Sequence, residues 1–302
     1  MTMKIDWLEG CATALVTPFK TDLSLDEECF AGLIARQIAG GVKLLVPCGT
    51  TGESVTMTES ERLRVIELTI EVAREKGAYV IAGTGSNNTA ASIEFTKKAQ
   101  ALGADAALLV APYYNKPTQE GLFAHFKAIA DAAPDLPVML YNVPGRTASN
   151  IAAETTIRLA DECENIVATK EASGNFSQVM EIINRKPDNF TVFAGDDATA
   201  LPLIALGARG LVSVAANEIP DLLSQLVSAA LDNDFAAARR VHYRILPLME
   251  ANFIESSPAP LKFVMREMGL LTETLRLPLV PVTEKTQAVL REIIAALNLT
   301  QI

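Results

Sequence analysis

The sequence predicts a (β/α)8 barrel, followed by a small C-terminal helical module, in a chain of 302 residues. Three observations carry this prediction. Eight short apolar segments recur between residues 12 and 214, amphipathic patterns separate them, and the strand signals stop after about residue 232. We therefore expect a barrel that carries the active site over residues 1–232 and a helical module over residues 233–302.

The expected strands are rich in Val, Leu, Ile and Ala along their whole length. Such continuous apolar segments are typical of parallel strands that are buried on both faces. The segments are Ala12–Thr17, Lys43–Pro47, Tyr79–Gly83, Ala106–Ala111, Pro137–Asn142, Ile166–Lys170, Thr191–Ala194 and Gly210–Val214. A doubly wound sheet is the alternative, but no glycine-rich dinucleotide loop follows the first strand, which favours the barrel.

Helix signals lie between these strands. The clearest is at Thr58, which forms a capping box with Glu61 and precedes an apolar helical face that ends before Gly77. A second helix is expected from about Thr89 to Leu102 and ends in the same way, at a glycine. The expected helices of the C-terminal module are Phe235–Phe253, Pro260–Met268 and Glu284–Leu297.

Composition narrows the class of protein. Apolar residues make up 49% and charged residues 21%, as in globular proteins, and the net charge of −10 argues against general nucleic-acid binding. The four cysteines form no CxxC pair, and two histidines cannot supply a multi-histidine metal site. No membrane span or N-terminal leader is recognisable. We expect a soluble, cytoplasmic protein.

Reactive groups gather at the ends of the expected strands. In a parallel barrel these ends form one rim, where active sites lie. The strand ends carry GTTGE at 49–53, PYYN at 112–115, YNVPGRT at 141–147, Lys170, GDD at 195–197 and GLVSV at 210–214. Hydroxyls, phenols, a guanidinium and one amine therefore converge on a single mouth.

Lys170 is the most informative of these residues, because it ends an apolar strand and precedes a polar turn. Desolvation lowers the pKa of an ammonium group, so part of the population can be the neutral nucleophile that attacks a carbonyl. This position predicts an enzyme that forms an imine. The alternative is a surface lysine that caps a strand, but the convergence of reactive groups on the same rim favours the imine.

Other side chains on the rim complete a possible site. Thr50 and Thr51 offer hydroxyls and backbone N–H groups to a small carboxylate. Tyr141 is the candidate acid and base, since neither histidine lies at a strand end. Arg146 can clamp a substrate carboxylate because its guanidinium is bidentate and permanently charged. Glu53 is expected to accept from backbone N–H groups rather than to act as a base.

Two further pairs of residues can each be interpreted in two ways. Tyr113 and Tyr114 lie in a loop, and they indicate either a subunit contact or packing against their own barrel. Asp196 and Asp197 could suggest a metal. Without further ligands, paired carboxylates are more often helix N-caps, and we expect no metal here.

Six motifs together resemble a known family. They are GTTGES at Gly49–Ser54, IAGTGSN at Ile81–Asn87, PYYNKP at Pro112–Pro117, YNVPGRT at Tyr141–Thr147, KEASGN at Lys170–Asn175 and GDDA at Gly195–Ala198. In this order and spacing, along nearly the whole chain, they resemble the class I pyruvate-dependent lyases typified by N-acetylneuraminate lyase. The Tyr-Tyr pair and Arg146 are similar to members that condense pyruvate with L-aspartate-4-semialdehyde in lysine and diaminopimelate biosynthesis.

The resemblance implies a role for each residue of the site. Lys170 would form the Schiff base with pyruvate, whose carboxylate would bind Thr50 and Thr51 near the backbone carbonyl of Val212. Tyr141 would transfer protons, relayed through Thr51 and through Tyr114 of a neighbouring subunit. Arg146 would hold the carboxylate of L-aspartate-4-semialdehyde. The resemblance further implies a homotetramer built from tight dimers, and no external cofactor.

The resemblance leaves two alternative functions open, and the sequence departs from the family pattern at one site. An aldolase of a 2-keto-3-deoxy sugar acid would share the Lys170 imine, and a non-catalytic sensor barrel would not bind pyruvate covalently. Members inhibited by L-lysine carry histidines where this chain has Glu59 and Arg62, and a glutamate at Ala91. Ser54 and Asn87 match the inhibitor cleft of those members. We therefore expect weak or absent feedback by lysine.

Overall fold

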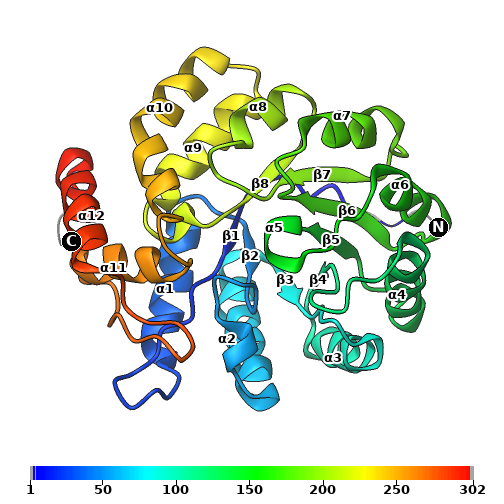
Figure 1. Ribbon diagram of the computed structural model, residues 1–302, viewed down its shortest axis with the longest axis horizontal. Coiled ribbons are helices and arrows are strands. Elements are labelled where there is room, and N and C mark those ends of the chain that lie inside the picture. The colour runs from blue at the N-terminus through cyan, green and yellow to red at the C-terminus, as the bar shows by residue number, and fades with distance from the viewer. Residues whose placement is uncertain (1–2, 4, 300–302) are drawn as a thin grey trace.

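Eight parallel strands form a closed barrel in the computed structural model, which describes residue 3 and residues 5–299 (Figure 1). The strands are β1 Gly10–Ala14, β2 Leu44–Val46, β3 Tyr79–Gly83, β4 Ala106–Val110, β5 Val138–Asn142, β6 Ile166–Glu171, β7 Thr191–Ala194 and β8 Gly210–Ser213. Each strand pairs with the next in sequence order, and β1 pairs with β8 to close the barrel. The predicted barrel is confirmed.

Helices follow the strands along the chain, and most of them surround the barrel on its outer side (Figure 1). They are α1 Glu27–Ala39, α2 Glu59–Lys76, α3 Thr89–Leu102, α4 Gln119–Ala132, α5 Pro144–Thr147, α6 Ala153–Glu162, α7 Phe176–Arg185, α8 Ala200–Ala205, α9 Pro220–Leu231, α10 Phe235–Ala251, α11 Ala259–Glu267 and α12 Glu284–Leu297, with short 3-10 turns η1 Ser54–Thr56 and η2 Ala215–Asn217. The capping box of Thr58 and Glu61 begins α2, and Gly77 ends it in the left-handed conformation with φ +70°. Glycine adopts this conformation without the steric cost that a side chain would bring.

The first strand is shorter than predicted at its C-terminal end. Residues 15–17 are buried, as their apolar character suggested, but the strand ends at Ala14, and Leu15 makes the last backbone bond to β2, from its N–H to the Val46 carbonyl at 3.0 Å. The backbone N–H of Val16 donates instead to the Asn217 side chain at 3.0 Å, and the Thr17 hydroxyl donates to the Gly52 carbonyl at 2.8 Å. The segment therefore ties the β1 end to two neighbouring loops.

Two apolar layers stabilise the barrel. Inside it, side chains from facing strands pack into one cluster that includes Leu44, Met139, Val167, Phe193 and Val212. A second, larger cluster lies between the sheet and the surrounding helices. Because both faces of the strands are buried, their sequences read as continuous apolar segments.

The C-terminal helices pack against the barrel rather than apart from it. Leu226 of α9 belongs to the same apolar cluster as Leu248 of α10 and Leu290 of α12. The predicted boundary between residues 232 and 233 falls in the turn between α9 and α10. The division into two domains stays a prediction.

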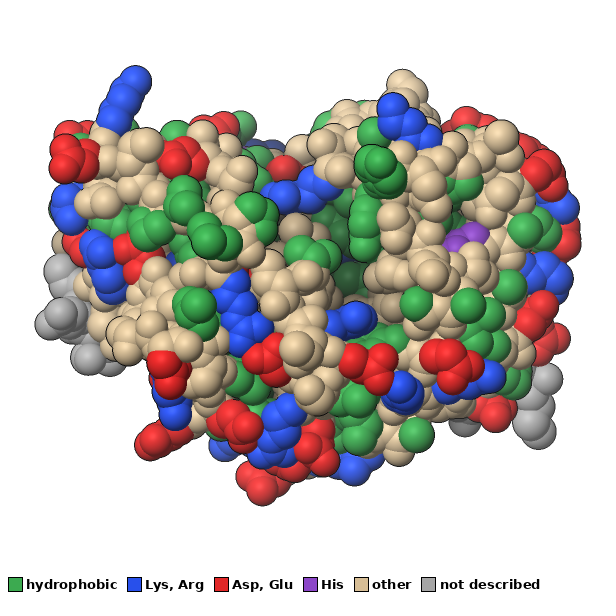
Figure 2. All heavy atoms as spheres, turned by 60° about the horizontal axis from the view of Figure 1, so that its bottom comes forward, with side chains coloured by type: hydrophobic (Ala, Val, Ile, Leu, Met, Phe, Trp, Pro, Cys, Tyr) green, Lys and Arg blue, Asp and Glu red, His purple; other side chains and the backbone are tan. Residues whose placement is uncertain are grey.

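On the face shown in Figure 2, positive and negative side chains are mixed rather than separated. Acidic and basic side chains alternate there with hydrophobic and neutral ones, and the face is hollowed near its centre. In the part of the chain that the structure describes, no helix combines the length and the apolar character needed to cross a membrane.

Candidate active site

The carboxyl ends of the strands enclose two adjoining cavities, of about 100 Å³ and 230 Å³. Lys170 and Thr51 line the smaller cavity, and Tyr113 lines the larger one. Both cavities share the residues Gly49, Thr50, Leu108, Tyr141, Val143 and Arg146. The structure thus brings together the predicted amine, phenol, threonine pair and guanidinium.

Lys170 lines the smaller cavity and is only 5% exposed. It pairs in register with Tyr141 of β5, and its Nζ lies 4.2 Å from the centroid of the Tyr141 ring. Among the described residues, no carboxylate lies within ion-pair distance of this amine. The amine is therefore held on an aromatic face and is not committed to an acidic partner.

Because Gly195 has no side chain, the Lys170 side chain can occupy the space beside it. A β-carbon at Gly195 would lie 3.1 Å from both Cγ and Cε of Lys170, and 2.7 Å from Cβ of Ala172. Contacts this short force neighbouring atoms to move. The absence of a side chain after β7 thus allows the lysine to reach the cavity.

The loop between β2 and η1 presents the two threonines. Thr51 is buried and Thr50 is exposed, and their hydroxyls have no protein hydrogen bond within the described residues. The loop itself is fixed, because the Gly52 carbonyl accepts from Thr17 and a β-carbon at Gly52 would lie 2.9 Å from the Leu15 carbonyl oxygen. Rigid backbone and free hydroxyls suit a site for a small polar ligand.

Arg146 comes from the short helix α5, which starts at Pro144 directly after β5. Its guanidinium has no acidic partner in the described parts of the chain, although sixteen ion pairs form elsewhere. An unpaired guanidinium beside a cavity can bind an anionic ligand in bidentate fashion. Its position agrees with the predicted clamp.

Two predicted residues lie outside both cavities. Tyr114 is 88% exposed and has a φ of +72°, which is unusual for a residue with a side chain. Val212 is buried in the interior cluster of the barrel, and Val214 lines the smaller cavity instead. The Thr51 hydroxyl and the Tyr141 phenol line the same cavity but do not hydrogen-bond to each other.

The paired aspartates accept from backbone N–H groups, but the expected helix-capping role is wrong, because the N-cap of α8 is Thr199, without a side-chain hydrogen bond. Asp196 accepts from the backbone N–H groups of Ala198 and Thr199 at 2.9 and 3.3 Å. Asp197 is buried and accepts from the N–H groups of Val214 and Ala215, across the gap to the next strand end. Burial raises the pKa of Asp197. Both carboxylates thus hold loops, and Asp196 also lines the smaller cavity.

Sequence reasoning missed the contribution of the C-terminal module. Phe253 and Ser257, which follow α10, line the smaller cavity together with Lys170. Lys262 of α11 is fully buried and pairs with Glu53, so Glu53 has a cationic partner besides the backbone N–H that was expected. No local pattern could reveal these residues, since they lie more than 80 positions beyond Lys170 and reach the site only through the packing of α10 and α11.

Comparisons with known proteins show the family to which the whole chain belongs. Residues 7–297 match the model of the dihydrodipicolinate synthetase family. A 4-hydroxy-tetrahydrodipicolinate synthase from Koribacter versatilis is 52% identical over 289 residues, which cover 95% of each chain. The dihydrodipicolinate synthase of Aquifex aeolicus has a TM-score of 0.95 at 42% identity and covers 97% of this chain and 99% of its own. The enzyme of Acinetobacter baumannii complexed with pyruvate has a TM-score of 0.94 at 42% identity, with coverage of 97% and 99%. The chain belongs to the dihydrodipicolinate synthetase family.

Proposed function

We propose that this protein condenses pyruvate with L-aspartate-4-semialdehyde to 4-hydroxy-tetrahydrodipicolinate, the reaction named by its relatives, in lysine and diaminopimelate biosynthesis. The observation that carries the proposal is the Lys170 amine, which is 5% exposed and lies in a cavity beside Tyr141, Thr50 and Thr51. A buried amine without an acidic partner is the group that imine chemistry requires.

The reaction balances without an external cofactor. The Lys170 amine adds to the keto carbon of pyruvate, and water leaves to give a protonated imine. This imine is the electron sink that allows the methyl group to lose a proton and become an enamine. The enamine carbon forms a bond to the aldehyde carbon of the second substrate. The amino group of that substrate then replaces the lysine nitrogen, which closes the ring and frees Lys170.

The remaining polar groups take the roles that the family resemblance implies. Thr50 and Thr51 hold the pyruvate carboxylate with hydroxyl and backbone N–H donors. The role that the resemblance implies for the Val212 carbonyl has no support from the two cavities, neither of which Val212 lines. Tyr141 transfers protons through Thr51. Arg146 binds the carboxylate of L-aspartate-4-semialdehyde at the cavity mouth.

We further propose that the protein works in the cytoplasm as a homotetramer in which Tyr114 completes the proton relay of a neighbouring subunit. Tyr114 is supported by its exposure and its strained backbone, because an exposed aromatic held at positive φ suits a subunit contact. Val55, on the same rim, is 82% exposed. Four free cysteines fit a reducing compartment.

Reductive trapping tests the function directly. Borohydride reduction with pyruvate should place one pyruvyl adduct on the peptide that carries Lys170, and the same sample should condense pyruvate with L-aspartate-4-semialdehyde. An aldolase of a 2-keto-3-deoxy sugar acid would form the adduct but cleave keto-deoxy acids instead. A sensor barrel would form no adduct. An adduct on another side chain would contradict the proposed mechanism.

The residues at three positions lead us to expect weak feedback inhibition by L-lysine. Glu59 forms an ion pair with Lys98, and the Arg62 guanidinium lies 3.7 Å from the centroid of the Phe95 ring. Ala91 offers no carboxylate. A cationic ligand would therefore meet a guanidinium and would lack an acidic partner at Ala91. A lysine titration at saturating pyruvate should show little inhibition, and strong micromolar inhibition would contradict this.

Gly195→Ala should impair catalysis without unfolding the barrel. The added methyl group lies 3.1 Å from Cε of Lys170, so it must displace the amine or the Ala172 segment. A shift of about 1 Å at a reacting group can lower kcat/KM on the order of 100-fold. Gly32→Ala in α1 is the matched control, because a β-carbon there meets nothing within 4 Å. The proposed packing role is wrong if both variants keep wild-type kcat/KM.

A further inference from the structure

We propose that Glu53 and Lys262 are positioning residues for the threonine loop, defined here as residues 49–53, and that the C-terminal module thereby controls how tightly the site binds the pyruvate carboxylate. The inference rests on the proposed function. Neither Glu53 nor Lys262 lines either of the two active-site cavities, so both would act on the substrate only through Thr50 and Thr51.

The first support is a fully buried ion pair between the barrel and the module. The Lys262 Nζ lies 2.5 Å from a Glu53 carboxylate oxygen, and both side chains are 0% exposed. The same ammonium donates to the Thr274 carbonyl at 2.8 Å and lies 4.5 Å from the centroid of the Phe19 ring. Burying two charges is costly, and a pair with such fixed partners constrains geometry more than it adds stability.

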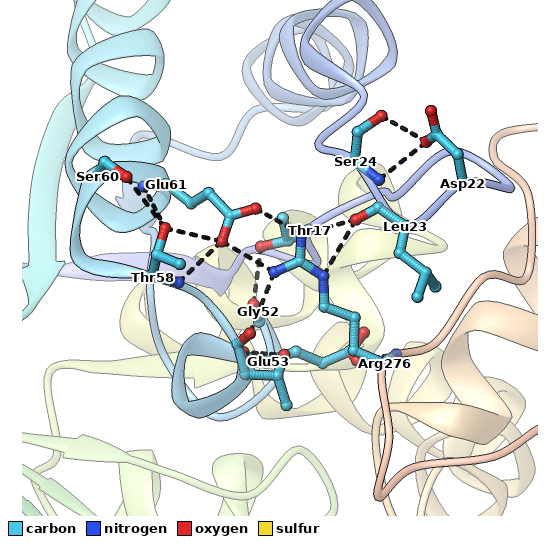
Figure 3. Close-up of polar contacts among 11 residues, drawn as sticks. Thr17, Asp22, Leu23, Ser24, Gly52, Glu53, Thr58, Ser60, Glu61 and Arg276 are labelled. Carbon is cyan, nitrogen blue, oxygen red and sulfur yellow. Dashed lines mark hydrogen bonds and ion pairs between the residues drawn. The ribbon is translucent and has the colours of Figure 1, made fainter.

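The second support is Arg276, which contacts the same Glu53 carboxylate and also binds the segment that follows the threonine loop (Figure 3). Its backbone N–H donates to the Glu53 carboxylate at 3.1 Å. Its guanidinium forms a bidentate contact with Glu61 and donates to the carbonyls of Thr56 and Leu23. The hydrogen bonds from Arg276 lower the pKa of Glu61 to about 2.

The third support links Glu53 to the threonines through the backbone. Glu53 adopts the left-handed conformation with φ +51°, which is unfavourable for a residue with a side chain. Its N–H donates to the Thr50 carbonyl at 3.0 Å, and this bond closes the turn that carries Thr51. The Thr17 hydroxyl fixes the Gly52 carbonyl from the barrel side. A change at the Glu53 carboxylate must therefore alter the turn that presents both hydroxyls.

The alternative is that the ion pair only attaches the module to the barrel. In that case its loss would lower the melting temperature, but the folded protein would bind pyruvate normally. A positioning role instead predicts a change in KM for pyruvate that exceeds the change in kcat, because the threonines hold the carboxylate throughout the reaction.

The test compares three full-length variants: Glu53→Gln, Lys262→Met and Leu290→Ala. Leu290 is buried in α12 and lines neither cavity, so its truncation controls for a loss of stability alone. We expect Glu53→Gln and Lys262→Met to raise KM for pyruvate at least about tenfold, and Leu290→Ala to leave it unchanged. A KM within twofold of wild type in both ion-pair variants overturns the proposal. If Lys262→Met does not fold, the KM of the nearly isosteric variant Glu53→Gln alone decides between the two outcomes.

Amide hydrogen exchange keeps this inference distinct from the proposed function. Faster exchange of residues 49–57 in Glu53→Gln, but not in Leu290→Ala, supports the positioning role even if the wild type traps no pyruvate. Exchange that is unchanged in the loop overturns it. A wild type without a pyruvyl adduct, in contrast, overturns the proposed function.

Discussion

Lys170→Met should abolish turnover, with a loss of kcat of at least about four orders of magnitude. Methionine keeps an unbranched stem of similar length, so it can occupy the space beside Gly195 and the Tyr141 ring. It has no amine to add to the keto carbon, and no other lysine of the described residues lines either cavity. Borohydride reduction with pyruvate should then leave the protein unmodified, as read by intact mass.

Solvent exchange of the pyruvate methyl protons gives a second measurement of the same step. In deuterated water the wild type should exchange these protons, because the enamine forms before the second substrate is needed. Lys170→Met should not exchange them. Lys97→Met on the exposed face of α3 is the control and should behave as wild type. A pyruvyl adduct that persists in Lys170→Met would place the chemistry on another side chain.

The barrel could be predicted from the sequence because its signals are local. Continuous apolar segments identify strands buried on both faces, and β3 and β7 have the predicted bounds. Thr58 and Gly77 mark the ends of α2 through capping chemistry that depends only on nearby residues. Once the strands are known, Lys170 and Tyr141 must share a rim, since the ends of parallel strands meet there.

The rest of the site depends on contacts between distant segments. Phe253 and Lys262 reach the barrel mouth through the packing of helices, which no short motif encodes. Glu53 was expected to accept from backbone N–H groups, and it does accept from that of Arg276, but its buried ammonium partner was not foreseen. Buried ion pairs across long sequence separations leave no periodic pattern. The polar partners of the rim are therefore harder to predict than the rim itself.

Tyr141→Phe should lower kcat on the order of 1,000-fold while imine formation continues, because a positioned acid and base contributes typically 10²–10⁴-fold. The phenylalanine ring can still support the Lys170 amine, which lies 4.2 Å from the ring centroid in the wild type. Reductive trapping at long incubation should remain complete. Exchange of the pyruvate methyl protons should slow, since it needs the missing hydroxyl. Tyr243→Phe, at an exposed position of α10, is the control.

Asp196 is the competing acid and base, because its carboxylate also lines the smaller cavity. Cys48 does not compete, since burial raises the pKa of its thiol to about 12. Asp196 already accepts from two backbone N–H groups, and the amide oxygen of Asp196→Asn can accept from both. We therefore expect Asp196→Asn to keep most of its kcat. If Asp196→Asn loses about 1,000-fold and Tyr141→Phe loses less than tenfold, the proton passes through the carboxylate and Tyr141 serves only as the surface on which Lys170 lies.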